Sequence, residues 1–404
     1  MSIENKWIRA AIPALLIHCS IGTVYCWSSF SEELSTQVGV SGSILGWAFS
    51  IAIFFLGMSA AFAGRFVEKD IHKSSLLACI CFTVGMLGTG VTIQFASNLG
   101  PVLTVIGIFL FYGVIMGIGL GVGYLTPVKT LMLWFSDNKG LATGISIMGF
   151  GLAKAIASPI MNYLVSKTSI SMMFFILGSV YFLMMLLGHF LLKKPEGWVE
   201  EKTTSVSLKT LIKKPTFIGC WLMFYLNITC GLALIACEKP ILKLLGIGTA
   251  AISVVQSCTA ATNALGRIGF STVSDKMKDR NTVYKIIFVM SAVISLTAFF
   301  TNSVTNKIAV IAIILLLLIN AGYGGGFSTM PALLSARFGM KNISKIHGLI
   351  LSAWGFAGLT GNQLTNLIIN KTGRYENVLI TIAVLYIVAL VIDFTLVKKT
   401  SEEL

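Results

Sequence analysis

The chain has 404 residues, of which 55% are hydrophobic and only 11% are charged. A soluble domain carries roughly 25% charged residues, so this composition and the mean hydropathy of +0.86 exclude an ordinary soluble protein. The formal net charge is +14. The basic residues lie in short segments between apolar runs and form no continuous basic face, which argues against a nucleic-acid partner.

Apolar runs long enough to cross a bilayer as helices recur along the chain, since each span needs about 20 residues. The first run exceeds the roughly 7–15 residues of a signal-peptide core, so we predict that it is a retained span. The sequence predicts an all-α polytopic membrane protein. Its twelve transmembrane helices are expected at 8–30, 42–64, 74–96, 102–127, 140–165, 171–192, 215–238, 250–272, 282–301, 307–335, 345–369 and 376–397.

The Lys and Arg residues between the spans predict the orientation, because cytoplasmic loops carry an excess of these residues. If both termini are cytoplasmic, 22 of the 30 Lys and Arg residues fall on the cytoplasmic side and 6 on the opposite side. The remaining two, Lys154 and Arg267, fall inside predicted spans. We therefore expect both termini in the cytoplasm.

The longest polar segment, 193–214, divides the chain into two similar halves. Residues 121–135 match residues 324–338 without a gap, and an acid followed by Lys ends the second span of each half, at Glu68 and at Asp275. We predict an N-terminal six-helix bundle (1–192), a cytoplasmic linker (193–214) and a C-terminal six-helix bundle (215–404). Parallel repeats of this kind are typical of transporters with a substrate site between the repeats.

These features resemble the major facilitator superfamily, whose short cytoplasmic loop motif is similar to the acid–Lys loops, with Glu68 where Asp is usual. Within it, the chain resembles the oxalate:formate antiporter family and its monocarboxylate-transporter relatives. The stretches that carry the resemblance are 22–30, 121–144, 263–275 and 347–355. The resemblance implies the major facilitator fold and alternating-access transport of a small carboxylate.

Arg267 is the strongest candidate for substrate binding. It lies eight residues before Asp275, roughly 12 Å along the helix, where a charge costs at least ~2.5–3.5 kcal/mol to insert. Its planar guanidinium matches a carboxylate in two parallel hydrogen bonds. Asn263 lies one turn earlier on the same helix face and offers an amide. The resemblance implies that the arginine at this position binds the substrate carboxylate.

Lys154 is the second intramembrane cation. In the oxalate antiporters a second cation lies on span 11, and the resemblance aligns Trp354 with that position. Lys154 supplies charge from the repeat-related span 5, or its side chain reaches the outer interface. A dicarboxylate needs two matched charges, so one arginine favours a monocarboxylate.

Several other residues inside the spans are candidates for the site. Tyr25, Tyr124, Tyr323 and Trp354 combine an aromatic ring with a hydrogen-bonding group and could line a cavity, or they pack between helices. His18, Glu238 and Asp393 are candidates for proton coupling, because each titrates and lies within a span. The alternative for His18 is a packed, hydrogen-bonded side chain, and for the two acids an interfacial position.

No cofactor or metal is expected. The eight cysteines match no zinc-ligand spacing, and the glycine-rich stretches lack the Gly-Lys-Ser/Thr of a nucleotide loop. The four histidines are widely separated, which argues against an enzyme. We expect a monomeric secondary transporter of pyruvate, lactate or formate in the cell membrane, working by proton symport or anion exchange. An oxalate:formate antiporter is the alternative, and a carboxylate sensor without transport is the remote one.

Overall fold

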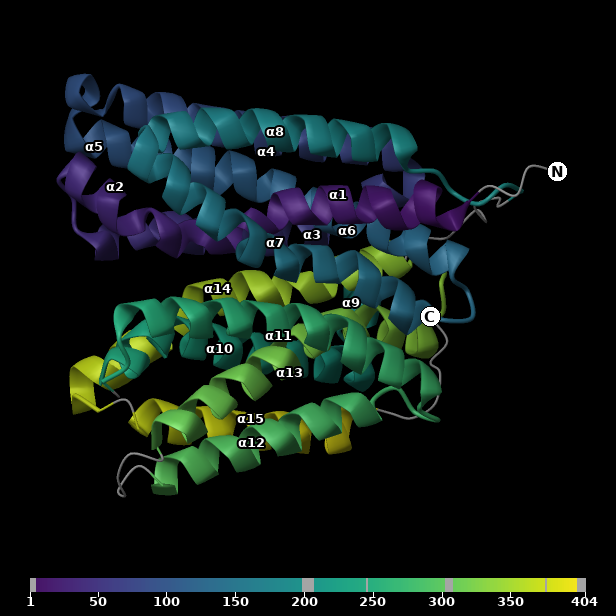
Figure 1. The fold of residues 1–404 in the computed structure, drawn as a ribbon. Coiled ribbons are helices and arrows are strands. Elements are labelled where there is room, and N and C mark those ends of the chain that lie inside the picture. The colour runs from purple at the N-terminus through teal and green to yellow at the C-terminus, as the bar shows by residue number, and fades with distance from the viewer. Residues whose placement is uncertain (1–4, 198–206, 245, 302–307, 375, 398–404) are drawn as a thin grey trace. The chain divides into compact units, whose positions relative to one another are not determined.

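A computed structural model describes residues 5–197, 207–244, 246–301, 308–374 and 376–397 (Figure 1). These residues form helices joined by short loops, with no strand among them. The elements up to the linker are η1 (Trp7–Ala11), α1 (Ile12–Ile21), η2 (Gly22–Ser29), α2 (Ser31–Val38), α3 (Gly42–Lys69), α4 (Ile71–Gln94), α5 (Ala96–Ile108), η3 (Phe109–Ile115), α6 (Met116–Trp134), α7 (Lys139–Lys167) and α8 (Ile170–Leu191).

The elements after residue 206 are α9 (Leu208–Leu211), α10 (Pro215–Leu244), α11 (Thr249–Lys276), α12 (Thr282–Thr301), α13 (Ile308–Phe338), α14 (Ile343–Thr372) and α15 (Glu376–Leu396). Every predicted span falls on one or more of these helices. Eight helical segments of the described chain are long and apolar enough to cross a membrane. The all-α membrane fold is therefore confirmed, whereas the count of twelve spans stays a prediction.

Local sequence signals start and end several helices. The carboxylate of Asp70 accepts hydrogen bonds from the backbone N–H groups of His72 (3.0 Å) and Lys73 (2.9 Å) at the start of α4. These hydrogen bonds, chiefly the one from Lys73, lower the pKa of Asp70. The hydroxyl of Ser169 caps α8 in the same way. At the other end of a helix, Gly373 stops α14 with a φ of 66°, which glycine adopts without strain.

The described chain forms two compact units. Unit 1 comprises Met1–Asp137, Ile145–Glu200 and Ser344–Gly355, and unit 2 comprises Asn138–Gly144, Glu201–Ile343 and Phe356–Leu404. Each unit thus combines most of one sequence half with a short helical segment from the other half. The predicted bundle boundary at 193–214 stays a prediction, and residues 198–206 of that linker lie outside the described part.

In unit 1, α4 packs along α8 and against α6, and α3 packs against α6 (Figure 1). The first turns of α14 lie against α3. A Cβ atom added to Gly348 would come within 2.2 Å of the carbonyl oxygen of Ala60, so only glycine allows this approach. Small residues at helix contacts are the usual way for membrane helices to pack closely.

In unit 2, the main contact is between α11 and α13 (Figure 1). A Cβ atom on Gly266 would lie 2.1 Å from the carbonyl oxygen of Ala321. The missing side chain therefore lets the two backbones meet next to Arg267, which follows in the sequence. This contact places that arginine between the two helices.

Large apolar side chains cover the outer faces of the helices. Phe62 is 79% exposed, Val102 71% and Phe190 68%. A surface with so many exposed large apolar side chains is unusual for a soluble monomer and is suited to lipid. The exposure pattern agrees with the spans expected from the sequence.

We predict that Gly266→Ala destabilises the protein by roughly 1–3 kcal/mol, because the added methyl group overpacks the contact between α11 and α13. Gly269→Ala on the same helix is the matched control, since no atom lies within 4 Å of the added Cβ. Thermal unfolding of the purified proteins in detergent measures the difference. Equal unfolding temperatures for the two variants would contradict the packing assigned here.

Candidate functional site

Arg267 is completely buried inside unit 2, with 0% of its surface exposed. Its Nε donates a hydrogen bond to Oδ1 of Asn263 at 2.9 Å. Its guanidinium carbon lies 5.2 Å from the centre of the Phe327 ring on α13, a distance at which a cation is attracted to the aromatic face. The amide and the ring together fix the orientation of the guanidinium.

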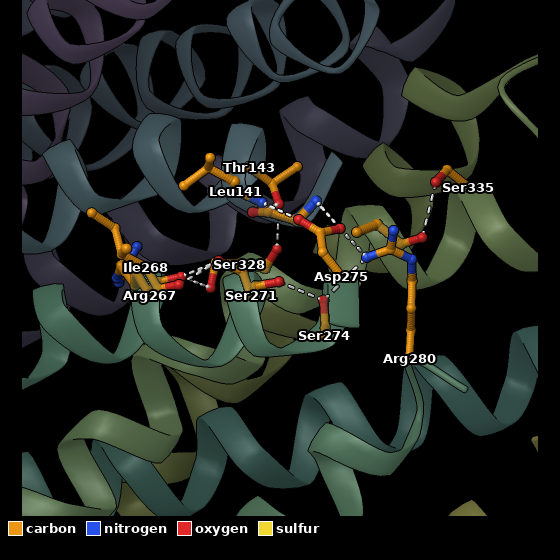
Figure 2. A network of polar contacts seen from close by, with 12 residues as sticks. Leu141, Thr143, Arg267, Ile268, Ser271, Ser274, Asp275, Arg280, Ser328 and Ser335 are labelled. Atoms are coloured by element: carbon orange, nitrogen blue, oxygen red, sulfur yellow. Dashed lines mark hydrogen bonds and ion pairs between the residues drawn. The ribbon is translucent and has the colours of Figure 1, made fainter. Parts of the chain in front are cut away.

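The backbone beneath Arg267 is held by two hydroxyl groups (Figure 2). Ser271 and Ser328 both donate to the carbonyl oxygen of Arg267, at 2.5 and 2.6 Å. Thr143 at the start of α7 donates in turn to the carbonyl oxygen of Ser328 at 2.7 Å. This chain of hydrogen bonds joins α7, α11 and α13 directly below the arginine.

A stripe of polar side chains runs along the buried face of α11. Thr259, Asn263, Arg267 and Ser271 follow at intervals of four residues, and none is more than 6% exposed. Glu238 on α10 is also buried and accepts a hydrogen bond from Thr259 at 2.7 Å. Glu238 therefore lies against the same face of α11 as Arg267, about 12 Å away along the helix.

Four aromatic side chains form a cluster in unit 1. The ring of Trp354 lies 5.3 Å from that of Tyr124, 5.4 Å from that of Phe150 and 6.4 Å from that of Tyr25, measured between centres. Tyr124 and Trp354 are fully buried, whereas Tyr25 on η2 is half-buried. Lys154 is half-buried and follows Phe150 by one turn of α7, so it lies on the same helix face.

His18 connects three helices of unit 1. Its Nδ1 lies 2.5 Å from the carbonyl oxygen of Ser146 on α7, and its Nε2 lies 3.0 Å from that of Tyr124 on α6. Both ring nitrogens therefore make contacts with the backbone. The structure gives His18 the packed, hydrogen-bonded environment that was the alternative to proton coupling.

The remaining candidates lie in unit 2. Tyr323 is fully buried, and its ring centre is 5.1 Å from that of Phe327. Asp393 is also fully buried, on α15, with Oδ2 3.6 Å from Nζ of Lys285 on α12. Asp393 is thus in an ion pair, and its place relative to the membrane interface stays a prediction. Among the described residues, no group of three His, Cys, Asp or Glu side chains could hold a metal ion.

The predicted residues therefore fall into two groups. Unit 2 brings Arg267, Asn263 and Tyr323 together around Phe327, and unit 1 brings Tyr25, Tyr124 and Trp354 together around Phe150. The two central phenylalanines were missed by the sequence analysis. The internal repeat contained the signal for one of them, because it aligns Phe327 with Tyr124.

The acid of each acid–Lys pair found in the sequence, Glu68 and Asp275, accepts hydrogen bonds from backbone N–H groups at the start of a helix. Asp275 accepts hydrogen bonds from the backbone N–H groups of Gly140 (2.9 Å) and Leu141 (2.8 Å) at the start of α7 (Figure 2). Arg280 donates to the same carboxylate at 2.5 Å. In unit 1, Glu68 accepts from the N–H of Ser344 at the start of α14 (3.0 Å). Negative charge at a helix N-terminus is stabilising.

We predict that Asp275→Asn destabilises unit 2 by about 1 kcal/mol, the usual contribution of a helix cap. The amide loses the charge that stabilises the N-terminus of α7 and its ion pair with Arg280. Asp137→Asn is the matched control, because Asp137 is exposed in the loop before α7. Thermal unfolding in detergent measures both variants. An unchanged unfolding temperature for Asp275→Asn would argue against the cap.

Sequence similarity links the chain to a known family of membrane proteins. The family model of the Major Facilitator Superfamily matches residues 14–362 and 235–403. The oxalate:formate antiporter of Oxalobacter formigenes is 24% identical, over 94% of this chain and 88% of that protein. Apicoplast pyruvate carrier 1 of Toxoplasma gondii is 24% identical, over 88% and 84% of the two chains.

Solved structures show the same fold. A bacterial homologue of the iron transporter ferroportin, in an outward-facing state, has a TM-score of 0.77 at 11% identity, over 95% of this chain and 97% of that one. Members of this family bind small molecules within the membrane. The buried polar residues, the exposed apolar surface and these matches agree, and the chain belongs to the Major Facilitator Superfamily, as an integral membrane transporter and not an enzyme.

Proposed function

We propose that this protein is a secondary active transporter of small organic monocarboxylates, such as pyruvate, lactate or formate, in the cell membrane. Arg267 is the residue that binds the substrate carboxylate. The observation that carries the proposal is the fully buried guanidinium of Arg267, oriented by Asn263 and Phe327 on membrane helices. Two relatives support it, because their names specify oxalate, formate and pyruvate.

The geometry around Arg267 suits an anion with a carboxylate group. Asn263 orients the guanidinium through Nε, and the planar guanidinium is the group that would present parallel N–H donors to two carboxylate oxygens. Hydrogen bonds between charged groups contribute about 1.5–3 kcal/mol each. The serine hydroxyls hold the backbone of Arg267, and Asn263 and Phe327 orient its side chain, so the guanidinium is pre-oriented for a substrate.

The aromatic cluster of unit 1 favours a monocarboxylate over oxalate. Trp354 stands at the position where the resemblance implies a cation in the oxalate antiporters, and it packs against three other aromatic rings. A tryptophan supplies no positive charge for a second carboxylate. Lys154, half-buried on α7, is the residue in unit 1 through which the dicarboxylate alternative would operate.

Coupling is by proton symport or by anion exchange. Of the three candidates from the sequence, Glu238 lies on the face of α11 that carries Arg267. Asp393 is paired with Lys285 on the α12–α15 side of unit 2, and His18 binds two backbone carbonyl groups. Of the three, Glu238 is therefore the residue whose protonation is best placed to depend on substrate binding at Arg267.

We predict that proteoliposomes containing the purified protein take up labelled pyruvate, lactate or formate faster than oxalate. Uptake is measured with an outward gradient of unlabelled anion and, separately, with an inward proton gradient. Faster oxalate uptake would favour the dicarboxylate alternative. Carboxylate binding without flux would indicate a sensor, and neither binding nor flux for any of the four anions would reject the function.

We further predict that Arg267→Ala reduces uptake at low substrate concentration by roughly 10–100-fold, since about 1.4 kcal/mol corresponds to a factor of ten. Arg267→Lys restores little, because an ammonium lacks the planar fork and the bond to Asn263. Arg374→Ala, in the exposed loop before α15, is the matched control and keeps wild-type uptake. Wild-type uptake by the Arg267→Ala variant would show that Arg267 does not bind the substrate.

A further inference from the structure

A second histidine in unit 1 has an environment opposite to that of His18. His347 lies one turn into α14 and is 1% exposed. Neither of its ring nitrogens makes a hydrogen bond to any described residue. A buried polar group left without a partner is destabilising, because it loses its hydrogen bonds to water and gains none in the protein. A side chain maintained at such a cost needs a reason other than packing, because an apolar side chain would fill the same space.

Close helix packing surrounds this imidazole. The ring of Tyr124 on α6 lies 6.2 Å from it, between centres. At the next residue, Gly348, an added Cβ atom would come within 2.2 Å of the Ala60 carbonyl oxygen on α3 and 3.3 Å of Leu125. A partner for His347 must therefore be small, since neighbouring backbone and side chains leave little space beside it.

Titratable and charged groups lie on every helix around His347. His18 on α1 and Tyr124 on α6 face His347 itself. Two residues earlier on α14, Lys345 interacts with Arg65 and Glu68 of α3, and Glu68 also pairs with Lys129 of α6. Glu68 is already engaged by Lys129 and by the N–H of Ser344. Both ring nitrogens of His18 already contact carbonyl oxygens. His347 is thus the imidazole of this cluster whose nitrogens remain available.

We infer that His347 binds and releases the proton that is coupled to carboxylate transport. This inference rests on the proposed function. A proton needs no cavity, and imidazole exchanges protons near neutral pH. In the binding step, the lone pair of the unprotonated ring nitrogen takes a proton from hydronium, which becomes water. Release breaks the same N–H bond and returns the proton to water, so each cycle leaves the histidine unchanged.

The imidazole is neutral while it is buried, because an isolated charge without a partner is strongly disfavoured there. Protonation therefore requires that water or an anion reach His347 during the cycle. Coupling follows from this requirement: a proton is taken up only in the step that opens the α3–α14 contact around the ring. A substrate anion favours the protonated form by its charge.

The test uses proteoliposomes with wild-type protein and His347→Gln, in which the amide keeps the polarity but does not titrate. Two rates are measured: exchange of labelled for unlabelled pyruvate at equal pH, and pyruvate-dependent proton entry reported by a pH dye inside the vesicles. We expect proton entry to fall by at least about tenfold while exchange stays within about twofold, because exchange needs no net proton transfer. His189→Gln, at the end of α8, keeps both rates and is the matched control.

Each other outcome counts against the inference. Proton entry that is unchanged in His347→Gln, or absent in the wild type while exchange persists, overturns the role of His347 and leaves the proposed function intact. Loss of exchange together with proton entry, in a variant that elutes as a single species like the wild type, assigns His347 to substrate binding instead. His347→Asn repeats the test if the Gln variant does not fold. Pyruvate is replaced by lactate or formate if the wild type exchanges only one of those, and the absence of both binding and flux for all four anions in the wild type overturns both proposals.

Discussion

A guanidinium buried among membrane helices is the constraint on which much of unit 2 depends. The charge of Arg267 is tolerable in a bilayer only if polar groups replace the water that it loses. Asn263 and the ring of Phe327 supply part of that environment. The absence of a side chain at Gly266 brings α11 and α13 close enough for the contact with Phe327. The close packing of α11 on α13 and the contacts from Asn263 and Phe327 therefore all stabilise the position of Arg267.

Around Phe150, the interior of unit 1 is built from aromatic rings. It also contains two imidazoles, one of which bridges backbone carbonyl groups while the other has no hydrogen bond to the described residues. The internal repeat thus provides two scaffolds of similar sequence with different interiors. Tyr124 and Phe327 illustrate this: they are aligned in the repeat, yet one packs against Trp354 and the other against Arg267.

The apolar runs were sufficient to predict the helices, because a bilayer requires long hydrophobic segments whose backbone pairs internally. The pairing of Asn263 with Arg267 was predictable too, since it depends on helical spacing alone. Contacts between distant segments were not. Nothing in the order of residues indicates that Phe327 lies over the guanidinium, that His18 is hydrogen-bonded while His347 is not, or that the starts of α7 and α14 join the units formed by the opposite sequence halves.

The starts of α7 and α14 each belong to the unit formed mainly by the other half of the sequence, so the strength of the contacts that hold them matters. Each is held by a carboxylate at a helix N-terminus, Asp275 for α7 and Glu68 for α14. Such a contact contributes about 1 kcal/mol, less than twice the thermal energy. The cap itself therefore contributes only a small part of what holds each helix start, and the close packing at Gly140 and Gly348 supplies more. A substitution that removes one carboxylate should therefore weaken the helix start without releasing it.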